Sequence, residues 1–315
     1  MVNYSPRLLF KPGGSNAGCG MANVRVGLIG LGIMGWRIAK NLRDAGLLIG
    51  GVYNRTFDKA LRFSREFGVE AFKTPSELTK ASDVIITMLS DDEAVRNVIV
   101  GSDGVLSGLR PGSLVIDMST ISPSVSIELA NTIKSRGGGE MVDAPVIGTS
   151  VAVERKEIVV LIGGSDEAFN RAREVLQYTA KTIVHVGPNG YGLYAKLINN
   201  ALLGSYVVAL AEVVQLGKAF GLSDSVILDV LTKLSSARSP TSELKVPKML
   251  SGGDYSVQFA LKHMRKDLDI VSREASMRGV PIPMASLALQ FYRMAERMGL
   301  SEEDFAAVLK VLTKQ

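Results

Sequence analysis

VRVGLIGLGIMG, residues 24–35, joins a short apolar run to a turn rich in glycine. Gly30, Gly32 and Gly35 follow the pattern G-x-G-x-x-G, and a stretch with helical spacing comes next. In such a strand–turn–helix the first glycine permits a tight turn, the second lets a pyrophosphate approach the backbone, and the third allows close helix–strand packing. The amides at the helix N-terminus attract phosphate. We therefore expect a dinucleotide cofactor rather than a turn that only serves packing, with contacts at Gly30, Leu31, Gly32, Ile33, Met34 and Gly35.

Short apolar runs continue through the first half of the chain and alternate with amphipathic stretches. The runs are residues 24–29, 47–53, 84–89, 114–118, 140–146, 158–162 and 182–186. Between the first two runs, Met34, Ile38 and Leu42 have helical spacing and Gly46 is a stop signal. Strands that alternate with helices predict a parallel sheet with right-handed crossovers. The predicted fold class is therefore α/β, with a Rossmann-type doubly wound parallel sheet.

The pattern changes after Pro188, and no further strand is predicted. Residues 191–220 are typical of one long helix, apolar on most faces, and helical spacing continues through residues 257–277, 283–298 and 303–312. We expect three parts: a disordered or extension tail over residues 1–21, a cofactor-binding Rossmann domain over residues 22–187, and an all-helical substrate and oligomerisation domain over residues 188–315.

Charge and composition narrow the class of partner. The chain has 36 Lys and Arg against 31 Asp and Glu, scattered without a basic run, which favours small anionic ligands and no nucleic acid. The chain has a single cysteine, Cys19, which argues against a disulfide framework and favours a cytoplasmic location. With only two histidines as well, a metal site built from Cys or His ligands is not expected. The longest strongly apolar stretch, residues 201–211, is too short to span a bilayer, so we expect no membrane segment.

The end of the second apolar run indicates which dinucleotide binds. A carboxylate at this position would accept the ribose 2′-hydroxyl of NAD. Asn54, Arg55 and Thr56 stand there instead. Arg55 can pair with a 2′-phosphate, and its two neighbours can donate to it, so we predict NADP; the alternative is that Arg55 is a solvated surface cation. We also assign cofactor contacts to Met88 and Leu89, which end the third run.

Four further segments, in order, resemble motifs of the β-hydroxyacid dehydrogenase family, in particular its branches related to 3-hydroxyisobutyrate dehydrogenase. They are D-x-S-T-x-x-P at residues 117–123, D-A-P-V at 143–146, G-x-G-x-x-x-K-x-x-N-N at 190–200, and K-D-L at 266–268. Together with the glycine turn and residues 54–56, the matches span roughly residues 24 to 270.

The resemblance implies a role for particular residues. Ser119 and Thr120 would contact the substrate, and Thr120 would also contact the cofactor together with Lys266. Lys196 would act on the reacting oxygen, and Asn200 would hold the substrate. After D-A-P-V, most members have Ser-Gly-Gly, whose amides hold a carboxylate. Here residues 147–149 are Ile-Gly-Thr, so Gly148 keeps an amide for the substrate while the exact substrate stays open.

The same lysine also stands out without the family. Lys196, Asn199 and Asn200 share one face of an otherwise apolar helix, because residues three and four apart are neighbours. Lost hydration favours the neutral form of a lysine there, which general acid–base catalysis needs. The alternative is a structural hydrogen-bond donor at the domain interface.

The predicted function is NADP-dependent oxidation of a small 3-hydroxy acid, of the L-serine or 3-hydroxyisobutyrate type. Lys196 takes the hydroxyl proton during hydride transfer. One alternative is an NADPH-dependent reductase of glyoxylate or succinic semialdehyde, because residues 259–263 resemble that branch. Another is a non-catalytic, cofactor-bound interaction module. We expect a small carboxylate substrate. We also expect a homodimer or homotetramer, because a long helix that is apolar on most faces tends to bury its surface against a second subunit.

Overall fold

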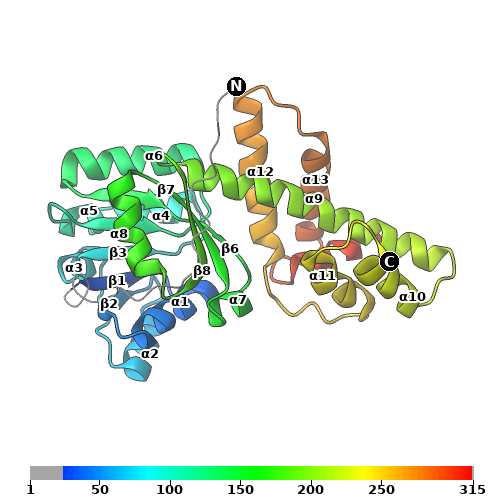
Figure 1. The fold of residues 1–315 in the computed structure, drawn as a ribbon, viewed down its shortest axis with the longest axis horizontal. Coiled ribbons are helices and arrows are strands. Elements are labelled where there is room, and N and C mark those ends of the chain that lie inside the picture. The colour runs from blue at the N-terminus through cyan, green and yellow to red at the C-terminus, as the bar shows by residue number, and fades with distance from the viewer. Residues whose placement is uncertain (1–23, 314–315) are drawn as a thin grey trace. The chain divides into compact units, whose positions relative to one another are not determined.

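The computed structural model describes residues 24–313. The chain forms two compact units, which divide between Lys196 and Leu197, inside the long helix α9 (Tyr191–Ala219) (Figure 1). The predicted tail and Cys19 lie outside the described residues. The division falls later than the boundary expected after residue 187, since the first turns of α9 group with the unit that holds the sheet.

An eight-stranded sheet forms the centre of the first unit, in the order β2-β1-β3-β4-β5-β7-β6, with β8 paired to β7 (Figure 1). The strands are β1 (Arg25–Ile29), β2 (Leu48–Tyr53), β3 (Val84–Thr87), β4 (Leu114–Asp117), β5 (Glu140–Asp143), β6 (Val146–Ile147), β7 (Ile158–Gly163) and β8 (Ala180–Gly187). Pairing is parallel from β2 through β5, and β8 is parallel to β7. The predicted Rossmann-type α/β fold is confirmed.

The sheet departs from the fully parallel arrangement at β7, which runs antiparallel to β5 and β6. The single run expected over residues 140–146 is two strands, β5 and β6. Only the five-residue helix α7 (Ser150–Glu154) stands between β6 and β7. A parallel connection needs a longer crossover, so this short link returns the chain in the opposite direction.

Helices cover both faces of the sheet (Figure 1). They are α1 (Ile33–Asp44), α2 (Phe57–Phe67), α3 (Pro75–Lys80), α4 (Asp92–Val100), α5 (Val105–Gly108), α6 (Pro123–Thr132) continued by the π-helical η1 (Ile133–Gly137), α7, and α8 (Asp166–Leu176). Alternate residues of a strand face opposite sides, so Val26 and Leu28 pack in one apolar cluster and Ile29 in another. The carboxyl ends of β1, β3 and β4 lie in register, which is where open α/β sheets bind ligands.

In the second unit, all regular secondary structure within residues 197–313 is helical, apart from one isolated bridge between Ala260 and Asp304. Its elements are the rest of α9, α10 (Asp224–Asp229), the π-helical η2 (Val230–Leu234), α11 (Pro240–Leu250), α12 (Leu261–Met277), α13 (Pro283–Arg297) and the 3₁₀ helix η3 (Phe305–Val311). The helix expected from residue 257 begins at Leu261. Tyr292 is fully buried in this core and donates to the carbonyl of Gly204.

By length and composition, α9 alone among the described helices is apolar enough to cross a membrane. In this structure, 44% of the most apolar 18-residue stretch of α9 is buried. The core helix of a soluble protein passes the same test, so the helix is weak evidence for a span, and the expected absence of a membrane segment stays a prediction.

Candidate active site

In the glycine turn after β1, two of the three glycines have no room for a side chain, whereas the third faces open space. Gly30 has a φ of +97°, and a Cβ there would lie 2.3 Å from the carbonyl oxygen of Met88. A Cβ on Gly35 would lie 1.9 Å from the carbonyl oxygen of Gly30. A Cβ on Gly32 would meet nothing within 4 Å. The open side of the turn lies at the start of α1, so these residues fit a cofactor pyrophosphate.

Asn54 ties this turn to the corner between β2 and α2. Its Oδ1 accepts the amide of Leu31 at 2.9 Å, and its Nδ2 donates to the carbonyl of Thr56 at 2.9 Å. The amide side chain therefore holds two loops together and keeps one proton for a ligand. Arg55 and Thr56 are exposed beside it. The structure thus places all three predicted residues next to the glycine turn.

A chain of hydrogen bonds connects the segments at the carboxyl ends of β3 and β4. Thr87 Oγ1 donates to Asp117 Oδ1 at 2.7 Å, and the same oxygen accepts the amide of Ser119 at 3.1 Å. Ser119 Oγ accepts the amide of Leu89 at 2.8 Å. This chain of bonds fixes Ser119, which is buried, and joins two segments that the sequence singled out separately, residues 88–89 and 119–120.

Asp143, at the end of β5, is the first residue of the D-A-P-V segment, to which the sequence analysis assigned no role of its own. Its Oδ1 accepts the amide of Gly190 at 2.5 Å, and its Oδ2 accepts the amide of Leu193 at 2.9 Å. Gly163 and Gly192 leave room for it, since a Cβ on either would lie within 3 Å of a carboxylate oxygen. Asp143 thus anchors the start of α9, where helix amides lack partners of their own.

Burial raises the pKa of Asp143 to about 7, and the charge of nearby Asp117 acts in the same direction. The amide bonds from Gly190 and Leu193 oppose this effect because they favour the carboxylate. The carboxyl group of Asp143, which contacts the start of α9, therefore has a pKa near neutral pH.

Lys196 lies one helical turn after Leu193 and is buried, with 8% of its surface exposed. Of the other predicted residues in the first unit, Thr120 is half-buried, whereas Gly148 is exposed. Gly148 has a φ of +141°, and a Cβ there would lie 2.9 Å from Ile158. This position therefore favours glycine, and its backbone remains accessible to a ligand.

The second unit brings together Asn200 and Lys266 through Asp267. Asn200 Nδ2 donates to Asp267 Oδ2 at 2.6 Å, and Lys266 Nζ lies 3.2 Å from Asp267 Oδ1. Asn199 Nδ2 donates to Asn200 Oδ1 at 2.9 Å. Asp267 is 1% exposed and orients the amide of Asn200. The K-D-L segment contained this residue, but its bond to Asn200 spans 67 positions and leaves no local signal.

No group of three or more His, Cys, Asp or Glu side chains among residues 24–313 could hold a metal ion. In the first unit, the polar groups around the predicted site include backbone amides of the glycine turn, the side-chain amide of Asn54, the hydroxyl of Ser119 and the buried amine of Lys196. This set suits a phosphate-anchored organic cofactor and proton transfer at an oxygen atom.

Two family models match the chain. Residues 25–187 match the NAD binding domain of 6-phosphogluconate dehydrogenase, and residues 190–312 match the NAD-binding domain of NADP-dependent 3-hydroxyisobutyrate dehydrogenase. Among similar proteins, 2-(hydroxymethyl)glutarate dehydrogenase of Eubacterium barkeri is 34% identical over 92% of this chain and 95% of that protein.

Two further relatives share nearly the whole length. An NAD-dependent L-serine dehydrogenase of Pseudomonas aeruginosa is 32% identical over 91% of this chain and 97% of that protein. The solved structure of Mycobacterium tuberculosis 3-hydroxyisobutyrate dehydrogenase with L-serine is 30% identical in sequence. The match covers 92% of this chain and 99% of that one, with a TM-score of 0.82. The strand order, the glycine turn and these matches agree, and the chain belongs to the family of NAD(P)-dependent β-hydroxyacid dehydrogenases.

Proposed function

We propose that the protein oxidises the hydroxyl group of a small 3-hydroxy acid with NADP, and that Lys196 transfers the proton. The observation that carries this proposal is the burial of Lys196 one turn beyond the Asp143 anchor of α9. A buried amine is favoured in its neutral form, which can accept a proton from an alcohol.

The proposed substrate contacts are made by a hydroxyl, a backbone amide and a side-chain amide. Ser119 Oγ accepts the amide of Leu89 and can still donate its own proton to a carboxylate. The exposed backbone at Gly148 offers a second contact. Asn200, held by Asp267, offers a third, one turn along α9 from Lys196. Thr120 contacts both the substrate and the cofactor in this scheme.

The proposed cofactor contacts are the glycine turn, residues 54–56, Met88, Leu89, Thr120 and Lys266. When bound, the nicotinamide supplies the hydride acceptor. Lys196 removes the hydroxyl proton in the oxidative direction and returns it to the carbonyl oxygen in the reverse direction. The protein thus orients the carboxylate and moves one proton at Lys196 Nζ.

The NADP preference is supported by two features. No carboxylate stands at the end of β2, and Arg55 is exposed in the short link between β2 and α2. The second family model is named for an NADP-dependent enzyme, whereas the Pseudomonas relative is named as NAD-dependent. Measuring kcat/KM with NADP⁺ and NAD⁺ at saturating L-serine tests this choice, and a preference for NAD⁺ would refute it.

The substrate is proposed to be L-serine or 3-hydroxyisobutyrate. The alternative is NADPH-dependent reduction of glyoxylate or succinic semialdehyde, which the sequence of residues 259–263 favours. A panel of these four compounds, followed by the absorbance of the reduced cofactor, separates the two. Cofactor binding without turnover of any of them would favour a non-catalytic interaction module.

We also propose that the protein is a cytoplasmic homodimer or homotetramer. On the second unit, large apolar side chains are exposed on α9 at Ile198 (74%) and Leu202 (73%), and just beyond its end at Phe220 (71%). Ile198 and Leu202 are one helical turn apart, and exposed apolar side chains that lie together often mark interaction sites. Sedimentation equilibrium tests this proposal, and a monomer at micromolar concentration would refute it.

A further inference from the structure

We infer that Asn41 and Arg37, on helix α1, position the loop at Gly148 by holding α7, the short helix that follows this loop. The inference rests on the proposed function, in which the backbone at Gly148 contacts the substrate. Asn41 and Arg37 are positioning residues in this scheme, because they act on the loop through α7.

Helix α7 is too short to keep its position by itself. It has five residues, Ser150–Glu154, and isolated helices of this length are not stable in water. Its N-cap residue, Thr149, makes no side-chain bond to the first turn. The helix lies directly against the loop, since a Cβ on Gly148 would lie 3.2 Å from the Cβ of Ala152. A shift of α7 would therefore move the loop.

The turn that ends α7 has a strained backbone. Lys156 has a φ of +58°, and it is the only residue other than glycine with a positive φ among residues 24–313. Glycine normally takes this conformation, because a Cβ crowds the backbone there. The amide of Lys156 donates to the carbonyl of Val153 at 2.9 Å. Such a turn persists only where surrounding contacts hold it, so α7 needs a firm anchor.

Asn41 supplies this anchor from inside the protein. Its side chain is buried, and its Nδ2 donates to the carbonyl oxygen of Val153 at 2.7 Å. The same nitrogen donates to Thr179 Oγ1 at 3.2 Å, so both of its protons are used. The carbonyl of Val153 thus accepts from Asn41 and from Lys156 together. Asn41 therefore joins α1 to α7 and to the strained turn at its end.

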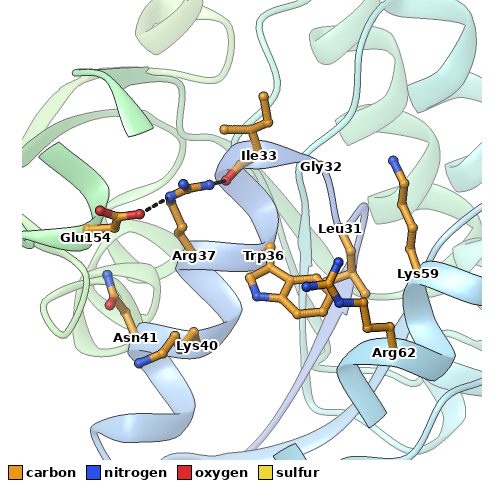
Figure 2. Close-up of a pocket in the computed structure, with 10 residues that line it drawn as sticks. All are labelled: Leu31, Gly32, Ile33, Trp36, Arg37, Lys40, Asn41, Lys59, Arg62 and Glu154. Carbon is orange, nitrogen blue, oxygen red and sulfur yellow. Dashed lines mark hydrogen bonds and ion pairs between the residues drawn. The ribbon is translucent and has the colours of Figure 1, made fainter. Parts of the chain in front are cut away.

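Arg37 makes a second connection at the surface. Its Nε donates to Glu154 Oε1 at 2.6 Å, and its Nη1 donates to the carbonyl of Ile33 at 2.8 Å (Figure 2). Ile33 is the first residue of α1, directly after Gly32 of the glycine turn. Arg37 and Asn41 are four residues apart, so they project from one face of α1. One guanidinium group therefore joins the end of α7 to the start of α1.

The two connections link both ligand regions of the proposed site through one helix. The glycine turn at the start of α1 is proposed to hold the cofactor pyrophosphate, and Gly148 is proposed to contact the substrate. Binding geometry is sensitive to displacements of about 1 Å, even when the altered residue lies far from the ligand. Loosening α7 should therefore weaken substrate binding more than cofactor binding, because the glycine turn is unchanged.

Steady-state kinetics of Asn41→Leu with L-serine or 3-hydroxyisobutyrate tests this inference. Leucine keeps about the volume of the side chain and removes the donor to Val153. We expect the KM for the substrate to rise about tenfold, while kcat stays within about twofold, because uniform binding is lost. The calorimetric Kd for NADPH should also stay within about twofold of the wild type.

Thr179→Val is the matched control for Asn41→Leu. Thr179 is also buried, and its replacement removes the second bond of Asn41 while the bond to Val153 remains. We expect KM, kcat and the Kd for NADPH to stay within about twofold of the wild type. An equal rise in KM in the two variants would attribute the effect to general destabilisation and overturn the inference.

Glu154→Ala is a second variant that leaves the core intact. Because its ion pair with Arg37 is partly exposed, we expect KM to rise only about two- to threefold. Its control is Lys40→Ala, which removes the ion pair with Asp44 on the same helix α1 and makes no change at α7. Lys40→Ala should leave KM as in the wild type, and an equal rise in both variants would contradict the role of Arg37.

Amide hydrogen exchange of residues 148–157 measures the hold on α7 without turnover. We expect exchange in this segment to be about tenfold faster in Asn41→Leu, because α7 opens locally more often. Exchange in Thr179→Val should stay as in the wild type, and exchange of β1 should be unchanged in both variants.

These results separate the inference from the function on which it rests. Unchanged exchange in Asn41→Leu would overturn the inference, whether or not the protein oxidises these acids. Faster exchange with an unchanged KM would also overturn it, because the substrate would not depend on the position of α7. A wild type that oxidises neither acid would refute the proposed function, and the exchange rates would still decide whether Asn41 holds α7.

Discussion

The carboxylate of Asp143 accepts the backbone amide of Leu193 at 2.9 Å, one helical turn before Lys196. A second bond, from the amide of Gly190, fixes the residue just before α9 begins. The end of a sheet strand therefore sets the position of the helix that carries the proposed proton-transferring residue.

Asp143→Ala should lower both stability and turnover. Two amides at the start of α9 lose their acceptor in a buried setting, which costs roughly 1–3 kcal/mol. Turnover should fall more than cofactor affinity, because the first turns of α9 lose their anchor while the glycine turn is untouched. The matched control is Ser165→Ala, which removes the cap from α8, where Ser165 Oγ accepts the amide of Ala168 at 3.1 Å. Equal losses of turnover in the two variants would contradict a specific role for Asp143.

The titration of Asp143 predicts a slope of stability with pH. Its pKa is about 7 in the folded protein, against an ordinary 3.8, so the folded state binds more protons between these values. The contribution of this group to stability is complete below pH 4 and is lost as the pH rises through 7. Urea unfolding between pH 4.5 and 8 measures the slope. Asp143→Asn should flatten it, and an unchanged slope would show that other groups dominate.

How far the sequence predicts this structure depends on the range of each interaction. The glycine turn, its strand and its helix were predicted correctly, because their constraints are local steric ones. The split of residues 140–146 into β5 and β6 was not predicted. The apolar run continues through Ala144 and Pro145, whereas the β5 ladder ends at Asp143, and its carboxylate bonds to amides about 50 positions later.

The remaining omissions have the same physical origin. Asp267 orients Asn200 from another helix, and Asn41 bonds the carbonyl of Val153 across 112 positions. Helix α11 was not among the predicted helices and contains Pro247, a residue that normally interrupts the helical pattern. In each case packing and long-range bonds decide the role of the residue, and no local spacing reveals them.

The glycine turn predicts two different outcomes for one kind of substitution. Gly35→Ala should impair both folding and cofactor binding, because its Cβ would lie 1.9 Å from the carbonyl oxygen of Gly30. Gly32→Ala should leave stability within about 1 kcal/mol, since a Cβ there meets nothing within 4 Å and the cost is that of an ordinary surface change. It should nevertheless weaken cofactor binding, because the added methyl group fills the open side of the turn. Thermal unfolding and calorimetry measure the two effects, and tight binding by Gly32→Ala would contradict the placement of the pyrophosphate.

Breaking a buried ion pair should destabilise the second unit. Lys245 Nζ lies 2.8 Å from Asp304 Oδ1, and both side chains are almost fully buried. Removing one partner leaves a buried charge, so Lys245→Met should cost roughly 3–5 kcal/mol. The backbone amides of Gln258, Phe259 and Ala306 still donate to Asp304 in this variant, so we expect a loss at the lower end of that range.

Lys248→Met is the matched control for Lys245→Met. Lys248 lies on the same helix and is partly exposed, and its Nζ donates to the carbonyl and the hydroxyl of Ser256. Its replacement should cost less than about 1 kcal/mol in urea unfolding. Similar losses in the two variants would show that the ion pair is not the source of the effect.

The most direct test of the account is the turnover of Lys196→Ala, measured with L-serine or 3-hydroxyisobutyrate and compared with Lys218→Ala, which removes an exposed lysine near the end of the same helix. We expect Lys196→Ala to bind NADPH within about twofold of the wild type and to lose kcat by about 10²–10⁴-fold, the range of general acid–base catalysis. Lys218→Ala should keep both. Near-normal turnover by Lys196→Ala would contradict the proposed mechanism.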